Sequence, residues 1–546
     1  MKKKQLFLIA SLTGILLALA WPTFGFAPIL FIALVPILWV ENYISNNKEK
    51  FSKFAVFKYS FIAFFIFNLL TTYWISYATF FGLFAPFLNA FLGGLVFQIY
   101  HNIKKIHFNN NKGFFVLPIL WISIEFLHLH WELTWPWMTF GNGFSTMPIM
   151  VQWYEYTGVF GGSLWVWIAN YFAYQAIKQI GINDKVGKLK LISKKLFTSN
   201  LLKFAFIFII PISLSLIIWT SFEEEKNTPI DVVVLQPNLE PYDETKMLSN
   251  NEIVNLLISL SEQKADENTS FILAPEGCLE ERIWEDQIQD NYNLSKLSNF
   301  ISKYPKAQMI VGSFSRRLQS EEEKTEASRK IEFAPLPYYS VYNSAIQIKQ
   351  DNNFNVYHKT KLVPGVERLP FKKYIGKILD FAIKLGNLPV GTLAIDDNHN
   401  LFKSESTNVK VTTPICYESI YGEFVAKRVK EGAEIIFIIT NDSWWRDTQG
   451  YKQHASYASL RAIETRRPIA RSANTGTSCF ISPKGEVSQK TKFWEQDVIK
   501  ASLIPQTKLT FYVKYGDYIA RICLFSSIII ILIGIVYKIR QRYEKK

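Results

Sequence analysis

The sequence of 546 residues contains only four cysteines, and no two of them form a CxxC pair. They are Cys278, Cys416, Cys479 and Cys523, a spacing that supports no disulfide framework. The chain also lacks a glycine-rich phosphate-binding loop, an internal repeat and a low-complexity tract. Motifs of these kinds are therefore excluded, and any chemistry must come from single residues that folding brings together.

Long apolar runs, in contrast, are frequent. With 49% hydrophobic and 16% aromatic residues, the chain is too apolar for a typical soluble protein. A helix needs about 20 residues to cross a bilayer. Runs near that length predict about eight membrane spans, at 5–21, 24–40, 57–77, 82–101, 113–128, 156–178, 200–219 and 518–538. The alternatives are buried core helices for these runs and a cleaved signal peptide for the first of them.

The loop at 129–155 contains no lysine or arginine, residues in which short cytoplasmic loops are enriched. The predicted loops on the other side and both chain ends carry them, at Lys2, Lys3, Lys4, Lys48, Lys50, Lys53, Lys104, Lys105, Lys178, Lys185, Lys188, Lys190, Lys194, Lys195, Lys538, Arg540, Arg542, Lys545 and Lys546. This alternation predicts that the N-terminus lies inside and that residues 221–516 face outward. It also accounts for most of the net charge of +14, which therefore does not indicate nucleic-acid binding.

Residues 221–516 read like a soluble domain. Short β-branched runs predict strands at 230–238, 270–277, 307–315, 340–348, 409–418, 433–442, 469–482 and 497–504. Helical periods lie at 251–265, 291–303, 419–431 and 453–466. This alternation predicts a layered α/β domain. We expect a membrane domain of about seven transmembrane helices in 1–220, the α/β domain in 221–516, and a C-terminal transmembrane helix with a basic tail in 517–546.

Cys416 follows a predicted strand, in the stretch PICYESIYGE at 414–423. A lone cysteine in such a run is usually a small buried hydrophobic residue. A nucleophilic thiol needs a base, and its substrate needs positive charge or N–H groups where the oxyanion develops. Glu276 ends the strand FILAPEG, and Lys359 and Glu367 lie on either side of a Pro-Gly turn. Each alone reads as a surface residue, but together they indicate one site.

Four motifs of this domain are APEG (274–277), HKTKLVPGVE (358–367), PICYES (414–419) and TNDSWW (440–445). They resemble the Glu, Lys and Cys signatures of the nitrilase superfamily, which implies an αββα sandwich. With several N-terminal spans and one C-terminal span, the whole chain is similar to bacterial apolipoprotein N-acyltransferases. The aromatic segment TWPWMTFGNG (134–143) also resembles a loop of that family's membrane domain.

Carried over residue by residue, the resemblance implies that Cys416 attacks the substrate and becomes acylated. Glu276 then acts as general base and later as acid, and Lys359 stabilises the tetrahedral intermediate. We also expect the charge of Lys359 to favour the thiolate form of Cys416. No metal ion or diffusible cofactor is implied.

The resemblance assigns supporting roles to four more residues. The backbone N–H of Tyr417 is expected to donate to the oxyanion, and Glu367 is expected to orient the other catalytic residues. Tyr417 and Glu418 are expected to shape the site. Trp444 matches an aromatic residue in the pocket that receives lipid.

The implied activity is acyl transfer at the periplasmic face of the bacterial cytoplasmic (inner) membrane. The acyl chain passes from a phospholipid to a cysteine thioester, and then to the α-amine of the diacylglyceryl-cysteine at the N-terminus of an apolipoprotein. The implied partners are the phospholipid donor, the apolipoprotein and the membrane, without nucleic acid. The alternatives are a membrane-tethered nitrilase-type amidase or hydrolase, and a non-catalytic membrane scaffold.

The segment 372–391 separates the lysine and cysteine motifs. Its apolar residues recur near helical spacing, and its lysines supply cationic positions, a pattern typical of a segment that lies in a membrane interface. We predict that it forms a mobile lid over Cys416. The alternative is an amphipathic helix packed on the α/β domain.

Overall fold

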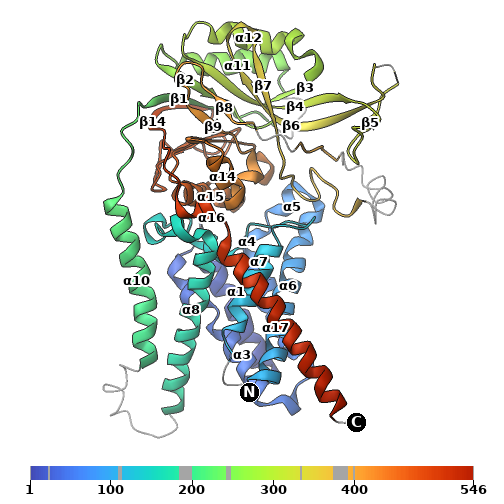
Figure 1. Ribbon diagram of the computed structural model, residues 1–546, viewed down its shortest axis with the longest axis vertical. Helices are drawn as coiled ribbons and strands as arrows, with labels where there is room; N and C mark the ends of the chain where they lie inside the picture. Colours follow the sequence, from blue (N-terminus) through green and yellow to red (C-terminus); the bar gives the residue numbers. More distant parts are fainter. Residues whose placement is uncertain are drawn as a thin grey trace. The chain divides into compact units, whose positions relative to one another are not determined.

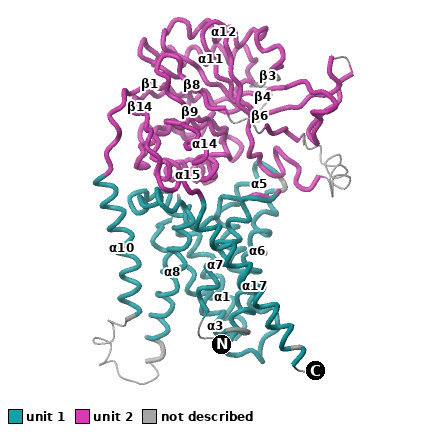
Figure 2. Tube along the Cα trace, in the orientation of Figure 1, with its two compact units in different colours: residues 1–131, 135–221, 517–546 teal, residues 132–134, 222–516 magenta. Residues whose placement is uncertain are grey.

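The computed structural model describes residues 2–22, 25–108, 113–183, 199–240, 247–332, 335–372, 392–396 and 400–544. The predicted lid at 372–391 lies outside the described residues except for Lys372. The chain divides into two compact units (Figure 2). Unit 1 comprises 1–131, 135–221 and 517–546, whereas unit 2 comprises 132–134 and 222–516. Unit 2 is therefore inserted between two segments that fold together.

Unit 1 is helical (Figure 1). Its described helices are α1 (Lys3–Ala20), α2 (Leu30–Ala33), α3 (Val35–Asn46), α4 (Ala55–Thr72), α5 (Ile75–Ala78), α6 (Ala85–His107), α7 (Val116–Leu127), α8 (Tyr154–Asn183), α10 (Ser199–Ser221) and α17 (Tyr518–Tyr543). Among the described residues, five helices are long and apolar enough to cross a membrane: Lys3–Ala20, Ala27–Asn46, Ala55–Thr72, Asn200–Ser221 and Tyr518–Gln541.

The remaining predicted spans also form helices, but of a different character. The helix α7 has only 12 residues. The helix α6 is long enough but ends in a polar turn that includes Lys104 and Lys105. The helix α8 contains Gly158, whose φ of +59° and ψ of −169° interrupt the regular helical backbone. Each of these helices therefore differs from the five long apolar helices in length, in composition or in backbone regularity.

Close packing in unit 1 depends on small residues. The helix α1 packs against α4, and α4 packs against α6. A Cβ atom added to Gly14 of α1 would lie only 2.4 Å from the carbonyl oxygen of Ala63 in α4. Only glycine therefore permits this approach, as is common where membrane helices pack.

Unit 2 contains two sheets. In the described residues the first has eight strands in the order β14-β1-β2-β4-β6-β5, with β3 on β4 and β7 on β6. The strands are β1 (Ile230–Gln236), β2 (Thr269–Leu273), β3 (Leu279–Trp284), β4 (Gln308–Gln319), β5 (Arg329–Lys330), β6 (Tyr338–Ile348), β7 (Phe354–His358) and β14 (Asp497–Leu503). The strands β1, β2 and β4 are parallel, and β6 runs antiparallel to β4 from Met309↔Ile348 to Gln319↔Tyr338.

The second sheet has six described strands in the order β13-β12-β11-β10-β9-β8. They are β8 (Phe402–Lys403), β9 (Lys410–Thr412), β10 (Ile435–Thr440), β11 (Ile469–Ala473), β12 (Cys479–Ile481) and β13 (Val487–Ser488). The strands β9, β10 and β11 are parallel. The carboxyl ends of β10 and β2 lead directly into the segments that carry the candidate site residues.

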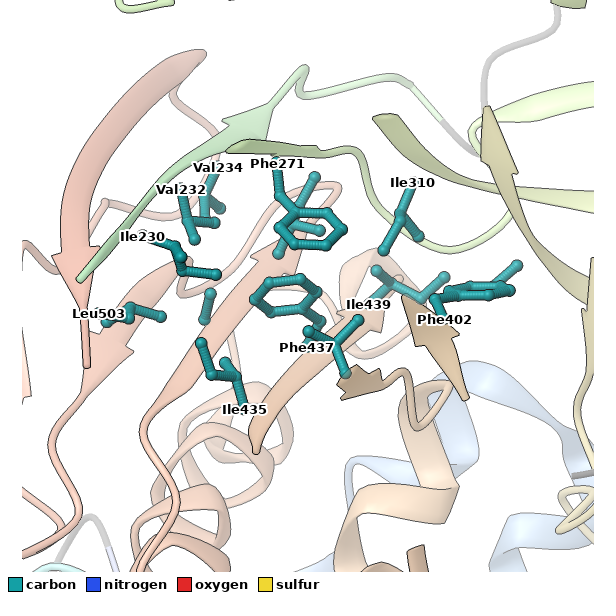
Figure 3. Close-up of a cluster of buried hydrophobic side chains, with 14 of the residues drawn as sticks. Ile230, Val232, Val234, Phe271, Ile310, Phe402, Ile435, Phe437, Ile439 and Leu503 are labelled. Atoms are coloured by element: carbon teal, nitrogen blue, oxygen red, sulfur yellow. The ribbon is translucent and has the colours of Figure 1, made fainter. Parts of the chain in front are cut away.

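The core lies between the two sheets (Figure 3). Val232 of β1 and Phe271 of β2 meet Ile435 and Phe437 of β10, all of them fully buried. The rings of Phe271 and Phe437 pack edge to face, with centroids 5.0 Å apart. Because burial of such a side chain contributes about 1.5–3 kcal/mol, this layer is a major source of the stability of unit 2.

Helices cover the outer faces of both sheets (Figure 1). Side chains alternate along a strand, so Val233 of β1 points away from Val232 and packs with α11 (Asn250–Glu262) and α12 (Tyr292–Ile301). The second sheet packs against α14 (Gly422–Lys430) and α15 (Gln449–Thr465). The layers are helix, sheet, sheet and helix, which confirms the predicted αββα sandwich.

Candidate active site

Lys359 directly follows β7, and only 1% of its surface is exposed. Its Nζ donates to Glu276 Oε1 at 2.9 Å and to Glu367 Oε1 at 2.8 Å. Burial alone lowers a lysine pKa, but the charges of Glu276 and Glu367 outweigh it and raise the pKa of Lys359 well above its usual value. Lys359 is thus a permanent positive charge held between two carboxylates.

Glu276 lies three residues beyond the end of β2. Besides Lys359, the side-chain amide of Asn343 in β6 donates to its Oε1 at 2.7 Å, and the backbone N–H of Asn441 donates to its Oε2 at 2.9 Å. A Cβ atom on Gly312 in β4 would lie 2.5 Å from the Cα of Glu276, so glycine is needed there. Contacts from both sheets therefore fix this carboxylate.

Cys416 is the first residue of the 3₁₀ helix η11 (Cys416–Ile420), and its φ is +49°. A non-glycine residue in this left-handed region costs about 1–3 kcal/mol and is frequent at active sites. The hydroxyl of Ser419 donates to the Cys416 carbonyl at 2.7 Å, and His454 Nε2 lies 3.1 Å from the same oxygen. Contacts with the following turn and with α15 thus hold the backbone in this conformation.

The Cys416 thiol experiences the charges of both Glu276 and Lys359. Burial raises the pKa of this thiol well above its usual value, and the Glu276 carboxylate raises it further. The positive charge of Lys359 opposes the rise without cancelling it. The charge of Lys359 therefore favours the thiolate of Cys416, as expected, but burial and the Glu276 carboxylate together outweigh its effect on the thiol pKa.

Glu418 is fully buried and joins two loops. Its Oε1 accepts the backbone N–H of Thr360 at 2.7 Å, and its Oε2 accepts the backbone N–H of Ile415 at 2.9 Å. Thr360 follows Lys359 and Ile415 precedes Cys416 in the chain. One carboxylate therefore fixes the loop of the cation and the loop of the thiol relative to each other.

The other residues named from the sequence lie near these loops. Glu367 Oε2 accepts the backbone N–H of Val363 at 2.8 Å, which closes the turn that carries Glu367. The hydroxyl of Tyr417 donates to the carbonyl of Thr134 at 2.8 Å, a contact within unit 2. Trp444 lies in the 3₁₀ helix η12 (Ser443–Trp445) and is 46% exposed. The structure thus brings Glu276, Lys359 and Glu367 into direct contact, whereas Trp444 belongs to the exposed surface.

Sequence reasoning missed a buried network behind Cys416. Asp442 accepts from Arg471 Nη2 at 2.7 Å, and its other oxygen lies 3.0 Å from His454 Nδ1. All three side chains are buried. Burial opposes ionisation, but the charges of Arg471 and His454 outweigh it and lower the pKa of Asp442 to about 2. Asp442 lies in the TNDSWW motif, His454 in the predicted helix at 453–466, and Arg471 in the predicted strand at 469–482. No regular spacing in the sequence relates the three residues.

The remaining cysteines of unit 2 lie apart from this arrangement. The Cys278 thiol donates to the carbonyl of Gly312 at 3.5 Å, and burial raises its pKa to about 12. Burial likewise raises the pKa of Cys479 to about 11. Among the described residues, no group of three or more His, Cys, Asp and Glu side chains is arranged to hold a metal ion.

Comparison with known proteins covers both units. Residues 13–172 match the apolipoprotein N-acyltransferase N-terminal domain, and residues 293–507 match the carbon-nitrogen hydrolase family. The chain is 26% identical to apolipoprotein N-acyltransferase from Chlorobaculum tepidum, with 97% of each chain covered. It is 25% identical to apolipoprotein N-acyltransferase 1 from Treponema denticola, with 100% of each chain covered.

Among solved structures, the chain is similar to Saccharomyces cerevisiae Nit3, a member of the nitrilase superfamily. The identity is 15% and the TM-score is 0.35, and the similarity covers 52% of this chain and 93% of the Nit3 chain. The full-length matches and the two domain matches agree with the αββα unit and the helical unit described above. This chain therefore belongs to the apolipoprotein N-acyltransferase family of the nitrilase superfamily.

Proposed function

We propose that this chain moves an acyl chain from a phospholipid through a Cys416 thioester to the α-amine of the diacylglyceryl-cysteine of apolipoproteins. The arrangement of Glu276, Lys359 and Glu367 beside the Cys416 thiol carries this proposal, together with the family membership of the whole chain. The apolar helices and the family membership make the chain a multi-pass membrane protein. A site of this kind takes substrates whose acyl chains remain in the lipid.

The first step acylates the enzyme. Sγ of Cys416 attacks the carbonyl carbon of a phospholipid ester while its proton passes to the carboxylate of Glu276. The ammonium of Lys359 and the backbone N–H of Tyr417 stabilise the negative charge that develops on the carbonyl oxygen. The carbon–oxygen ester bond then breaks, and Glu276 returns the proton to the leaving alcohol, which departs as a lysophospholipid.

The second step acylates the lipoprotein. The neutral α-amine attacks the thioester carbonyl and passes a proton to Glu276, and Lys359 again stabilises the oxyanion. The carbon–sulfur bond breaks, an amide forms, and Glu276 returns the proton to the Cys416 sulfur. A fixed, buried ammonium suits both steps, because it needs no reorganisation when charge develops.

We assign the acyl-transfer chemistry to residues 221–516, the lipid-embedded helices to 1–220, and a last membrane helix with a basic tail to 517–546. In this proposal the catalytic domain faces the periplasm and the lysine-rich loops face the cytoplasm of the bacterial cytoplasmic membrane. The exposed indole of Trp444 then serves as a contact for the acyl chain.

Mass spectrometry of the intact protein tests the proposal. After exposure to a phospholipid with one defined acyl chain, the wild-type protein gains the mass of that acyl group, and hydroxylamine removes it. Addition of a diacylglyceryl-cysteine peptide then transfers the acyl mass to the peptide. Cys416→Ser, in which the oxygen is a poorer nucleophile, forms no thioester, whereas Cys479→Ala behaves like the wild type.

Two results contradict the proposal. A hydroxylamine-sensitive adduct on Cys416→Ser that peptide mapping locates at a residue other than 416 would place the nucleophile elsewhere. Release of free fatty acid without transfer to the peptide would favour a membrane-tethered hydrolase.

A further inference from the structure

A pocket lies among the helices of unit 1. The space between the helices is about 430 Å³, including the open mouth of the pocket. The helices α3, α6 and α8 provide most of its lining, which includes Glu41, Asn42, Lys104, Tyr174, Gln175 and Lys178. Every lining residue belongs to unit 1, so the pocket shares no residue with the candidate active site.

The side chains that line this pocket carry more positive than negative charge. Glu41 is buried, and its two carboxylate oxygens are already bound, by His101 Nδ1 at 2.8 Å and by Lys104 Nζ at 2.5 Å. Lys178 forms no ion pair with any residue that the structure describes. Because Lys104 balances Glu41, the ammonium of Lys178 gives the pocket an excess positive charge.

Neutral donors in the pocket also lack partners. The Tyr174 side chain is buried, and its hydroxyl has no hydrogen-bond partner among the described residues. The side-chain amides of Asn42 and Gln175 line the same pocket without a hydrogen bond to the described part of the chain. A buried polar group without a partner costs about 1–3 kcal/mol, so the Tyr174 hydroxyl is suited to an additional acceptor, and the half-buried amides of Asn42 and Gln175 can donate to the same ligand.

The pocket lies close to the helix ends. Glu41 is five residues before the end of α3, a distance of about 7.5 Å along the axis at 1.5 Å per residue. Lys104 lies three residues before the end of α6, and the exposed Lys48 and Lys50 follow α3. Head groups of a bilayer lie at the ends of its spanning helices, and basic pockets between such helices bind anionic lipid head groups.

We propose that this pocket binds a phosphate group, supplied by the head group of an anionic phospholipid. The phosphate oxygens accept from the ammonium of Lys178, the hydroxyl of Tyr174 and the amides of Asn42 and Gln175. The Glu41–Lys104 ion pair links α3 to α6 and so fixes two of the helices that line the pocket. This lipid is a resident ligand of the helical unit and not the acyl donor.

Native mass spectrometry of the full-length protein in detergent tests this site. The probe is dialkyl ether phosphatidylglycerol, whose ether bonds cannot acylate Cys416, with ether phosphatidylcholine and inorganic phosphate as comparisons. We expect phosphatidylglycerol to be retained more strongly than phosphatidylcholine. Lys178→Gln should weaken this binding by roughly tenfold or more, because a hydrogen bond to a charged group is lost, and Tyr174→Phe by roughly two- to tenfold.

Lys50→Gln is the matched control, because it removes the same charge from an exposed lysine outside the pocket. It should bind phosphatidylglycerol like the wild type. Retention of acyl-enzyme formation by Lys178→Gln and Tyr174→Phe will show that both variants are folded. Equal binding by all variants, or no preference over phosphatidylcholine, would overturn the proposal. If inorganic phosphate alone binds with the same dependence on Lys178, the site is a phosphate site but the lipid source is wrong.

Discussion

Cys416 and Lys359 show how burial changes the chemistry of a single residue. In water a nearby ammonium lowers the pKa of a thiol. In unit 2 the ammonium of Lys359 is bound by Glu276 and Glu367, and burial raises the pKa of the thiol further than Lys359 lowers it. In the proposed mechanism the proton leaves Cys416 as the bond to the acyl carbon forms, and Glu276 is the acceptor.

The rate of alkylation of Cys416 by iodoacetamide should follow this raised pKa. The wild-type rate should increase with pH only above the usual range of a thiol, because the protonated thiol is unreactive. Glu276→Gln removes the negative charge that raises the thiol pKa and leaves Lys359 in place. Its alkylation profile should therefore shift to lower pH. Mass spectrometry of Cys416 labelling over a range of pH measures both profiles.

Glu405→Gln is the control for this comparison, since Glu405 is an exposed carboxylate of the same unit that pairs with Lys349. Its profile should match the wild type. A profile of Glu276→Gln that stays in place or moves to higher pH would contradict the assigned role of the carboxylate.

At the scale of elements, regular patterns were predictable from the sequence and irregular ones were not. The runs at 230–238 and 433–442 form β1 and β10, because strands buried on both faces carry nearly continuous apolar runs. The predicted strand at 409–418 ends at Thr412, and the run at 469–482 is divided between β11 and β12. The short strands β5, β8 and β13 contain two residues each and leave no periodic pattern.

The candidate site likewise has residues that the sequence predicts and residues that it does not. The motifs around Glu276, Lys359 and Cys416 identified the charged residues. The positive φ of Cys416 depends on contacts with α15 that are distant in sequence. The same holds for Asn343, whose amide reaches two carboxylates from the middle of β6. Such roles arise only when separate elements meet.

Glu418 positions two elements, and Glu418→Gln tests this role. The substitution keeps the shape but replaces an acceptor oxygen by an NH₂ group that faces backbone N–H donors. We expect the acylation kcat to fall by about 10²-fold with little change in KM, because a misplacement of about 1 Å has such an effect. Steady-state kinetics with a diacylglyceryl-cysteine peptide measures the two parameters.

The control is Glu431→Gln, a substitution of a more exposed glutamate that follows α14 directly and pairs with Arg428. It should leave both parameters near the wild-type values. A rise in KM with unchanged kcat for Glu418→Gln would instead indicate a role in substrate binding.

Asp442 ties β10 to β11 and α15 through Arg471 and His454. Its pKa of about 2 lies below the value of 3.8 that an aspartate has when unperturbed. Its charge therefore contributes stability that is fully present above about pH 4 and is lost as the pH falls towards 2, by about 2 kcal/mol. Asp442→Asn should lower the free energy of unfolding of unit 2 by about 3–5 kcal/mol, because it leaves the buried Arg471 without a carboxylate.

Thermal unfolding of the full-length protein in detergent between pH 3 and 7 measures this effect. Asp447→Asn is the matched control, since Asp447 is exposed and lies 3.8 Å from Lys452. It should change stability by less than about 1 kcal/mol. An acid dependence that is the same in Asp442→Asn and the wild type would show that Asp442 is not the group that titrates.

At the scale of the whole molecule, lysine and arginine counts predict the orientation in the membrane. Alkaline phosphatase fused after Asn227 should be active, because this enzyme folds only outside the cytoplasm. The same enzyme fused after Lys105 should be inactive, and a cytoplasmic reporter at that position should be active. The reverse pattern would contradict the orientation and would remove the proposed site from the outer leaflet.

The insertion of unit 2 into unit 1 has a consequence for biosynthesis. The helix α17 packs against α7 and also contacts α6 and α8, although more than 380 residues separate it from α7 in the chain. At about 5–20 residues per second, a ribosome needs roughly 15–60 s to translate residues 222–516. During this interval the α/β unit can form its own sheets, while the helical unit still lacks the segment that covers α7. Unit 1 therefore completes its helix packing only after unit 2 has been translated, so the order of synthesis separates the folding of the α/β sheets from the final closure of the helical unit.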